Sequence, residues 1–208
     1  MKLYELGPTR SIRARWTLQE LDVPFESVKV NLPAGEHYSP AFLAINPAAR
    51  IPVLVDGDFV LNESVAICVY LADKYPAKRF MPTDLRERAD ALRWLFFAAT
   101  ELEQPLWRIT RNTRLYPESI RQPGDVDNAA REFGQMVNVL DQHMQGREFV
   151  VGDHATVVDF VTAYTLDWAS VLNLLGDFPK LGTYVQRMYA RPKAGPRIEV
   201  AARELNAA

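Results

Sequence analysis

Three consecutive residues, Asn62-Glu63-Ser64, place an amide, a carboxylate and a hydroxyl at the start of a predicted helix. A helix amino terminus carries free N–H groups and the positive end of the helix dipole, so it suits an incoming carboxylate. Glu63 can meet an ammonium group beside it. The pattern therefore fits a ligand that carries both charges of an amino acid. Plain capping of the helix by Asn62 or Ser64, with Glu63 complementing the dipole, is the alternative that needs no ligand.

A second candidate position is Ile51-Pro52, which stands at the mouth of the apolar run Val53-Leu54-Val55. Proline has no N–H donor, so within a sheet it is confined to a strand start, an edge or a special turn. A cis Ile51–Pro52 bond would explain the proline, and so would a trans proline that opens the strand. General statistics favour trans, because only about 5–6% of such bonds are cis.

The elements that must position these residues alternate in period over the first 75 residues. The first part of the pattern predicts a β-α-β unit with parallel strands. It consists of a strand over 2–6, a helix over 11–21 with Ser11 as its N-cap, and a strand over 25–30. Asp56-Gly57 between two apolar runs predicts an antiparallel hairpin, and a helix over 63–75 ends at Pro76. The order β-α-β then β-β-α predicts a thioredoxin-like fold.

Helical patterns replace the strand signals from Pro82 onward. The expected helices of this all-α bundle cover 84–109, 127–144, 156–174 and 179–190. We therefore predict an α/β domain over 1–77 and an all-helical domain over 84–208, joined by a proline-containing linker.

Composition narrows the function classes. The chain has 208 residues, 48% hydrophobic and 24% charged, which is ordinary globular composition. A net charge of −2 and a pI near 6.0 disfavour general nucleic-acid binding.

The single cysteine, Cys68, excludes an internal disulfide and fits a reducing compartment; we expect it to be an inert core thiol. The sequence shows no leader pattern, and its apolar runs are all clearly shorter than the ~18 residues that a membrane span needs. We therefore expect a cytoplasmic protein without a membrane partner. The three histidines share no metal-ligand spacing, and no metal is expected.

Together, the strand–loop–helix start, Ile51-Pro52, the hairpin and Glu63-Ser64 resemble the glutathione-binding domain of cytosolic, bacterial-type glutathione S-transferases. In the helical half, Thr156 and Asp159 resemble the family's capping box, and Ala190-Arg191-Pro192 resembles the segment after its last bundle helix. The resemblance covers the whole chain. It implies a homodimeric detoxification enzyme with glutathione as co-substrate.

The resemblance also implies roles for particular residues. The backbone of Ile51 would pair with the cysteinyl part of glutathione, with Pro52 as the cis residue, while Glu63 and Ser64 would hold the γ-glutamyl end. Two further glutathione-binding candidates follow from the same comparison, Arg50 in the loop before the strand and His37 in a loop that flanks the site.

In this family a Tyr, Ser or Cys near the first strand–helix junction donates a hydrogen bond to the glutathione thiolate and so lowers the pKa of the thiol. No tyrosine or cysteine stands at this junction, so Thr9 and Ser11 are the catalytic candidates. We prefer Ser11, because it should begin the helix, where its own N–H faces the sulfur. Ser11 serving only as the cap is the alternative. Arg10 or Arg13 would add positive charge, unless both are merely solvated.

The pocket for the electrophile is expected in the helical half, lined by Trp107, Arg108, Arg111 and Tyr164. The arginines would suit an acidic substrate, and ordinary salt bridges and core packing are the alternatives. The leading hypothesis is conjugation of the glutathione thiolate to an electrophilic small molecule. Glutathione-dependent peroxide reduction or dehalogenation on the same site, and a non-catalytic glutathione-fold scaffold, remain open alternatives. Thiol–disulfide exchange is disfavoured, because residues 9–11 hold no cysteine.

Overall fold

The computed structural model describes residues 1–207 and divides into two compact units. The first unit joins Met1–Pro82 to the C-terminal segment that begins at Tyr189, and the second is Thr83–Met188. This division differs from the sequence-based one, which assigned all of 84–208 to the helical half. The difference arises because the last helix packs on the first unit.

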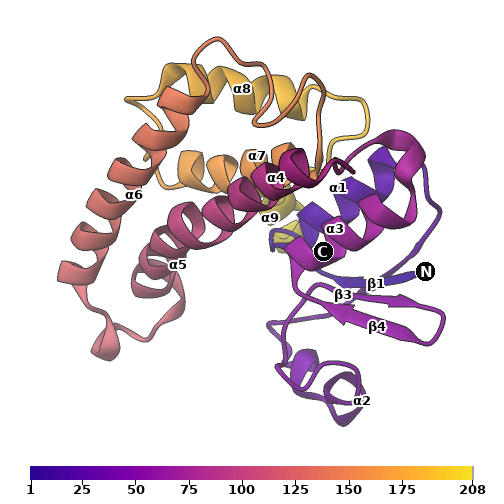
Figure 1. The fold of residues 1–208 in the computed structure, drawn as a ribbon. Coiled ribbons are helices and arrows are strands. Elements are labelled where there is room, and N and C mark those ends of the chain that lie inside the picture. The colour runs from indigo at the N-terminus through magenta and orange to yellow at the C-terminus, as the bar shows by residue number, and fades with distance from the viewer. Residues whose placement is uncertain (208) are drawn as a thin grey trace. The chain divides into compact units, whose positions relative to one another are not determined.

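A four-stranded sheet forms the first unit, in the order β2-β1-β3-β4 (Figure 1). β1 (Lys2–Glu5) runs parallel to β2 (Glu26–Lys29), while β3 (Val53–Asp56) runs antiparallel to both β1 and β4 (Phe59–Asn62). The parallel pair and the Asp-Gly hairpin confirm the predicted thioredoxin-like arrangement. Because β3 alone is reversed, its start lies at the same end of the sheet as the ends of β1 and β4.

Helices cover both faces of this sheet. α1 (Ser11–Glu20) and α3 (Ser64–Lys74) pack side by side on one face (Figure 1). On the other face, Phe42 of α2 (Pro40–Leu43) packs against Val53 and Tyr4. Successive side chains of a strand point to opposite faces, so the fully buried Leu3 and Leu54 point toward α1 and α3.

The first helix begins differently from the prediction. Ser11 is the first residue of α1 and not its N-cap, which is Arg10. The reason is that Oγ1 of Thr9 accepts the N–H of Ser11 at 3.2 Å, so a neighbouring hydroxyl takes the capping role. The hydroxyl of Ser11 is thereby left for other contacts.

The helix α9 (Ile198–Ala207), which the sequence analysis missed, packs on Gly7 in the junction between β1 and α1. A Cβ added at Gly7 would lie 3.0 Å from Cβ of Ala201, and one added at Gly195 would lie 3.0 Å from Cγ2 of Ile12. A side chain at either position would therefore be tightly packed, and its neighbour would have to shift by a few tenths of an ångström. Further along α1, Glu20 accepts two hydrogen bonds from Arg191, at 2.6 and 2.8 Å.

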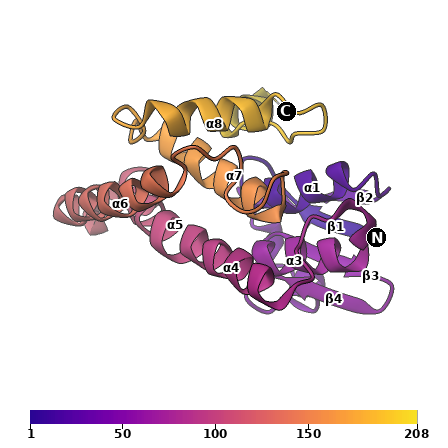
Figure 2. The ribbon, with the colours of Figure 1, turned by 45° about the horizontal axis from the view of Figure 1, so that its top comes forward.

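The second unit is helical, as predicted (Figure 2). In place of one helix over 84–109, α4 (Leu85–Phe96) and α5 (Glu103–Thr110) alternate with two π-helical stretches, η3 (Phe97–Leu102) and η4 (Arg111–Leu115). The remaining α-helices of this unit are α6 (Pro123–His143), α7 (Val157–Val171) and α8 (Pro179–Tyr189). The described residues also form short 3₁₀ turns. Two of these turns lie in the first unit, η1 (Glu36–Tyr38) and η2 (Pro76–Lys78), and η5 (Glu118–Ile120) lies in the second. Over residues 1–207, none of the helices has the length and apolar character that a bilayer span requires.

The predicted capping box at the start of α7 is confirmed. Oδ2 of Asp159 accepts the N–H of Thr156 at 2.9 Å, and the Thr156 hydroxyl accepts the N–H of Val158 at 3.2 Å. Asp159 is fully buried, and burial raises the pKa of its carboxyl. Oδ1 of Asp159 also accepts the N–H of Val150 at 2.9 Å, so the box ties the preceding loop to the helix.

Candidate active site

One end of the sheet brings together the three chemistry-bearing segments of the first unit. Tyr4, Val53 and Asn62 are paired across β1, β3 and β4 near this end. The loop that leads to Thr9 and Ser11 follows β1, Ile51-Pro52 precedes β3, and Glu63-Ser64 follows β4. Strand register therefore gathers residues that lie more than 50 positions apart in the sequence.

The hydroxyl groups of Thr9 and Ser11 form a pair at the start of α1. Their oxygens are 2.8 Å apart, within hydrogen-bonding distance. The Thr9 hydroxyl also donates to the carbonyl of Leu6, and the N–H of Leu6 lies 3.5 Å from Oγ of Ser11. Thr9 is half-buried, whereas Ser11 is only 1% exposed. Of the two residues, Thr9 is thus the less buried.

The Ile51–Pro52 peptide bond is cis, as the resemblance implies. Asn46, only 1% exposed, holds this loop: its amide donates to the carbonyl of Arg50 at 2.7 Å and its carbonyl oxygen accepts from the side chain of Asn62 at 3.2 Å. Ile51 itself lies outside the paired strands. Its backbone therefore takes no part in the ladders of the sheet.

The N-cap residue of α3, Glu63, makes no side-chain capping hydrogen bond in the described structure, and its carboxylate still stands where it complements the helix dipole. Glu63 occupies the N-cap position without a side-chain hydrogen bond to the helix, and Asn62 is engaged with Asn46. Glu63 adopts φ 67° and ψ 111°, a conformation that costs a non-glycine residue about 1–3 kcal/mol and is concentrated at functional sites. The first-turn N–H groups of α3 are therefore uncapped by side chains and suit an anionic ligand group.

Arg13 connects α1 to this helix start. Its guanidinium is buried, with 1% of the residue exposed, and Nη1 donates to Oγ of Ser64 at 3.3 Å. Ser64 is itself 5% exposed. Arg13 is therefore not a solvated arginine, and a positive charge stands directly behind the Ser64 hydroxyl. The sequence gives no signal for this contact, because its partners are 51 positions apart.

Arg50 and His37 lie at the periphery. Arg50 is exposed and its Nη1 donates to the carbonyl of Ala49 at 3.3 Å, so the side chain contacts its own loop. His37 is half-buried in η1, with its ring 4.0 Å from that of Tyr38. Nδ1 of His37 is buried and has no hydrogen-bond partner within residues 1–207. These two residues are not joined to the hydroxyl pair or to Ser64 by any described interaction.

The four candidates for an electrophile pocket behave differently from one another. Arg108 is ion-paired with Asp125 and with Glu132, so its side chain forms the ordinary salt bridges that the sequence analysis weighed against a substrate contact. Tyr164 is 2% exposed, which makes it a core residue. Trp107 and Arg111 are half-buried, with the guanidinium 5.8 Å from the indole centroid. Arg108 is half-buried as well, so its ion pairs rather than its exposure distinguish it from these two.

Cys68 takes no part in this chemistry. It is fully buried, Thr17 donates to its sulfur at 3.3 Å, and burial raises the pKa of the thiol to about 11. This agrees with the prediction of an inert core thiol. Among the described residues, no group of three or more His, Cys, Asp or Glu side chains is arranged to hold a metal ion.

Comparison with known proteins identifies the class that this fold and site define. The glutathione S-transferase N-terminal domain model matches residues 1–73, and the C-terminal domain model matches residues 108–192. Human glutathione S-transferase theta-1 is 32% identical over 176 residues, which cover 81% of this chain and 73% of that protein. The chain belongs to the glutathione S-transferase family.

Solved structures show the same fold. The glutathione transferase URE2P6 of Phanerochaete chrysosporium, in complex with oxidized glutathione, is 27% identical with a TM-score of 0.85, over 99% of this chain and 96% of that one. A glutathione transferase of Burkholderia graminis, with two glutathione molecules bound per subunit, has a TM-score of 0.84 at 24% identity, over 99% and 87% of the two chains.

Proposed function

We propose that this protein is a glutathione transferase that binds reduced glutathione at the shared end of β1, β3 and β4 and transfers its thiolate to an electrophilic small molecule. The observation that carries the proposal is the convergence of Thr9-Ser11, cis Ile51-Pro52 and Glu63-Ser64 at one end of the sheet. A non-catalytic scaffold protein would need none of these three segments.

In the proposed complex, the γ-glutamyl carboxylate lies over the first turn of α3 and accepts from the Ser64 hydroxyl. The buried charge of Arg13 adds to the attraction, and Glu63 meets the ammonium group. The cysteinyl backbone pairs with Ile51 in the manner of an added strand. His37 and Arg50 remain the candidates for the glycine carboxylate at the far end of the tripeptide.

We assign the thiol contact to Thr9 and a supporting role to Ser11. When the Thr9 proton turns from the Leu6 carbonyl to the sulfur, Oγ1 of Thr9 still accepts from the Ser11 N–H at 3.2 Å and can accept from the Ser11 hydroxyl at 2.8 Å. When the Thr9 oxygen accepts these two hydrogen bonds, the hydrogen bond that the Thr9 hydroxyl donates to the sulfur becomes stronger. The thiol proton leaves to water, and the thiolate then forms the carbon–sulfur bond as the leaving group departs.

The electrophile is proposed to contact Trp107 and Arg111, which would favour a substrate with an aromatic ring and an anionic group. Peroxide reduction or dehalogenation uses the same thiolate. Parallel assays with an aryl halide, a haloalkane and an organic hydroperoxide distinguish the three reactions. Replacing Arg111 with Leu should raise KM for a carboxylated aryl halide more than for its uncharged analogue.

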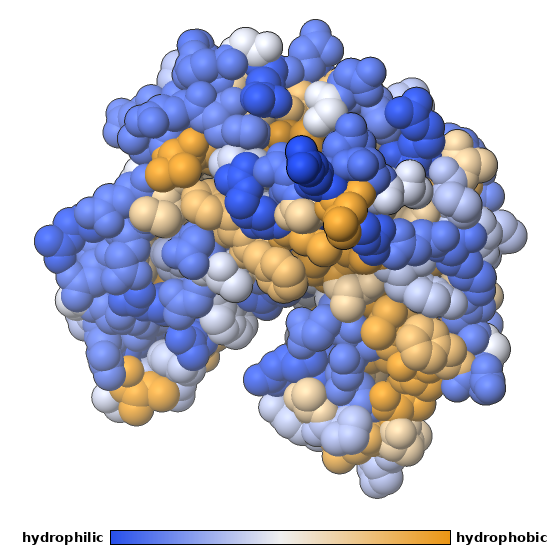
Figure 3. Space-filling model, viewed as in Figure 1, coloured by the Kyte–Doolittle hydropathy of each residue, from blue (hydrophilic) through white to orange (hydrophobic). Residues whose placement is uncertain are grey.

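We further propose a cytoplasmic homodimer. Phe59 and Val60 on the edge strand β4 are 45% and 41% exposed, and apolar side chains gather over this hairpin in Figure 3. Exposed apolar residues on an unpaired edge invite a second copy of the chain. A sedimentation mass twice that of the chain, which returns to 23.6 kDa in Phe59→Glu, is expected. A wild-type mass of one chain would contradict the dimer.

Isothermal titration calorimetry with reduced glutathione tests the site. Ser64→Ala and Glu63→Gln should each weaken binding by at least tenfold, while Ser119→Ala, an exposed serine of the second unit, should bind like the wild type. Retention of full affinity in both site variants, or no binding to the wild type, would contradict the proposed function.

A further inference from the structure

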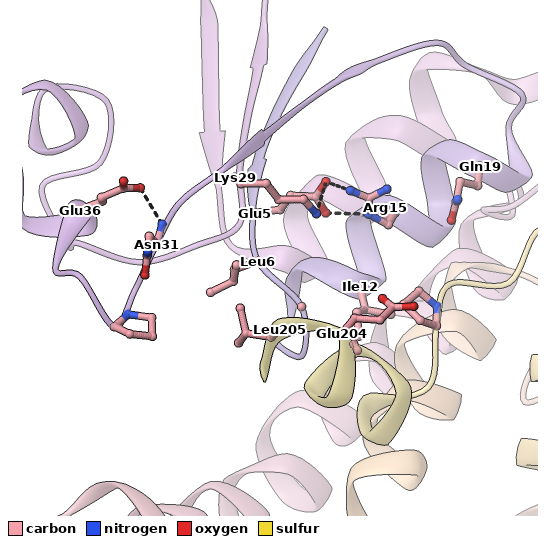
Figure 4. A pocket seen from close by; sticks show the side chains of 14 residues that line it. Glu5, Leu6, Ile12, Arg15, Gln19, Lys29, Asn31, Glu36, Glu204 and Leu205 are labelled. Atoms are coloured by element: carbon pink, nitrogen blue, oxygen red, sulfur yellow. Dashed lines mark hydrogen bonds and ion pairs between the residues drawn. The ribbon is translucent and has the colours of Figure 1, made fainter. Parts of the chain in front are cut away.

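A buried ion pair joins the end of β1 to α1, on either side of the loop that carries Thr9. The carboxylate of Glu5, the last residue of β1, has only 2% of its side chain exposed. One of its oxygens accepts from Nε of Arg15 at 2.8 Å, and the other accepts from Nη2. Figure 4 shows the two side chains facing each other in the wall of a pocket. A guanidinium that meets both carboxylate oxygens is fixed in direction as well as in distance.

Ser27 of β2 is the third member of this network. Its hydroxyl donates to Oε1 of Glu5 at 2.5 Å and accepts from Nη2 of Arg15 at 2.9 Å. Lys29 lies 4.0 Å from the same carboxylate, but 63% of its side chain is exposed, so its attraction is weakened by solvent. Arg15 therefore ties α1 to both parallel strands through one buried carboxylate.

The loop between the two charged residues is held by local hydrogen bonds. The N–H of Thr9 donates to the carbonyl of Leu6 at 3.2 Å, as does its hydroxyl, and the N–H of Ile12 donates to the carbonyl of Thr9 at 3.1 Å. These bonds lie within the loop and the first turn of α1. They set the shape of the loop, whereas its direction depends on how the helix start is held against the strand end.

Helix geometry connects Arg15 to the hydroxyl pair. Arg15 lies four residues after Ser11, so the two side chains stand on the same face of α1, one turn apart. Ser11 in turn contacts Oγ1 of Thr9 with its N–H at 3.2 Å and with its hydroxyl at 2.8 Å. A shift of α1 against β1 would therefore move both hydroxyl groups.

We propose that Glu5 and Arg15 are positioning residues for the thiol contact, because their ion pair holds the start of α1 against the end of β1 and so sets where the Thr9 hydroxyl meets the glutathione sulfur. The inference rests on the proposed function. The segments assigned to the rest of the tripeptide precede β3 and follow β4, outside this ion pair. Loss of the pair should therefore change the ionisation of the bound thiol more than the affinity for glutathione.

The pKa of the bound glutathione thiol separates positioning from a direct effect of charge. Glu5→Gln removes a negative charge and Arg15→Gln removes a positive one, so a direct effect would lower the thiol pKa in the first variant and raise it in the second. Positioning predicts a rise of about 0.5 or more in both variants, with a glutathione Kd within about threefold of the wild type. Shifts of opposite sign, or a wild-type pKa in both folded variants, would overturn the inference.

An exposed ion pair across the same two strands is the matched control. Lys2 and Glu26 are 3.2 Å apart with 52% and 58% of their side chains exposed, so Lys2→Gln and Glu26→Gln should leave the thiol pKa unchanged. Removing one partner of a buried pair is strongly destabilising, so the two charge variants are tested for folding first. If they do not fold, Ser27→Ala on the edge strand decides, and a wild-type thiol pKa in that variant would overturn the inference.

Amide hydrogen exchange without glutathione keeps this inference distinct from the proposed function. In both charge variants, exchange at the N–H of Ser11 should accelerate at least tenfold more than exchange at the N–H of Ile67, which donates to Glu63 in α3. A low thiol pKa in the wild type with equal acceleration at both amides would overturn the inference alone. An ordinary thiol pKa in the wild type would overturn the proposed function and this inference together.

Discussion

The hydroxyl oxygens of Thr9 and Ser11 lie 2.8 Å apart at the start of α1, where Thr9 is half-buried and Ser11 is only 1% exposed. In the proposed mechanism, Ser11 is therefore a positioning residue for Thr9. The backbone N–H of Ser11 points at the same Thr9 oxygen, at 3.2 Å. Loss of the Ser11 hydroxyl should therefore weaken the thiol contact without abolishing it, whereas loss of the Thr9 hydroxyl removes the contact.

The contact between Arg13 and Ser64 should appear as a coupling energy in glutathione binding. Arg13→Gln and Ser64→Ala should each weaken binding, and the double variant should lose less than the sum of the two. A coupling of about 1–2 kcal/mol is expected for a hydrogen bond to a charged group. Calorimetry on the four proteins of the cycle measures it. Strictly additive losses would show that Arg13 acts without Ser64.

The ion pair of Asp125 with Arg108 should make the stability of the second unit depend on acid pH. Hydrogen bonds from Arg108 hold the pKa of Asp125 below its ordinary value of about 3.9. Its contribution is therefore complete above that ordinary value and is lost as pH falls through the lower folded pKa. Asp125→Asn should cost about 1–2 kcal/mol at pH 7 and clearly less at pH 3.

Chemical denaturation at the two pH values measures this difference. Asp127→Asn, at an exposed position of the same helix, is the control and should change little at either pH. An Asp125→Asn penalty that stays constant or grows toward pH 3 would contradict the assigned role of the pair.

Cys68 should be unreactive in the folded protein. Its thiol is fully buried and burial raises its pKa to about 11, so very little thiolate is present at pH 7.5. Iodoacetamide should modify the chain only after denaturation, as followed by intact mass. Cys68→Ala should retain glutathione conjugation. Loss of conjugation with a folded Cys68→Ala protein would return this residue to the list of catalytic candidates.

The features that the sequence predicts correctly rest on local signals. The Asp56-Gly57 hairpin, the β-α-β unit and the Thr156–Asp159 capping box each depend on residues within a short window, so pattern and turn chemistry were sufficient. The cis state of Pro52 is different, because the residues alone left it open and only the family resemblance implied it.

The missed features depend on partners that are distant in sequence. Asn46 and Asn62 meet across 16 positions, and Arg13 meets Ser64 across 51. The packing of α9 on Gly7 spans almost the whole chain. The exposure difference between Thr9 and Ser11 likewise arises from burial by the fold.

The ionisation of bound glutathione tests the central claim most directly. The thiolate absorbance of bound glutathione, followed across pH, should give a thiol pKa clearly below about 8.5, the ordinary value for a cysteine thiol. Thr9→Val, which keeps the shape of threonine without its hydroxyl, should return this pKa to the ordinary value, Thr9→Ser should keep it low, and Ser11→Ala should lie between. An equally low pKa in wild type and Thr9→Val, with glutathione bound to both, would contradict the account.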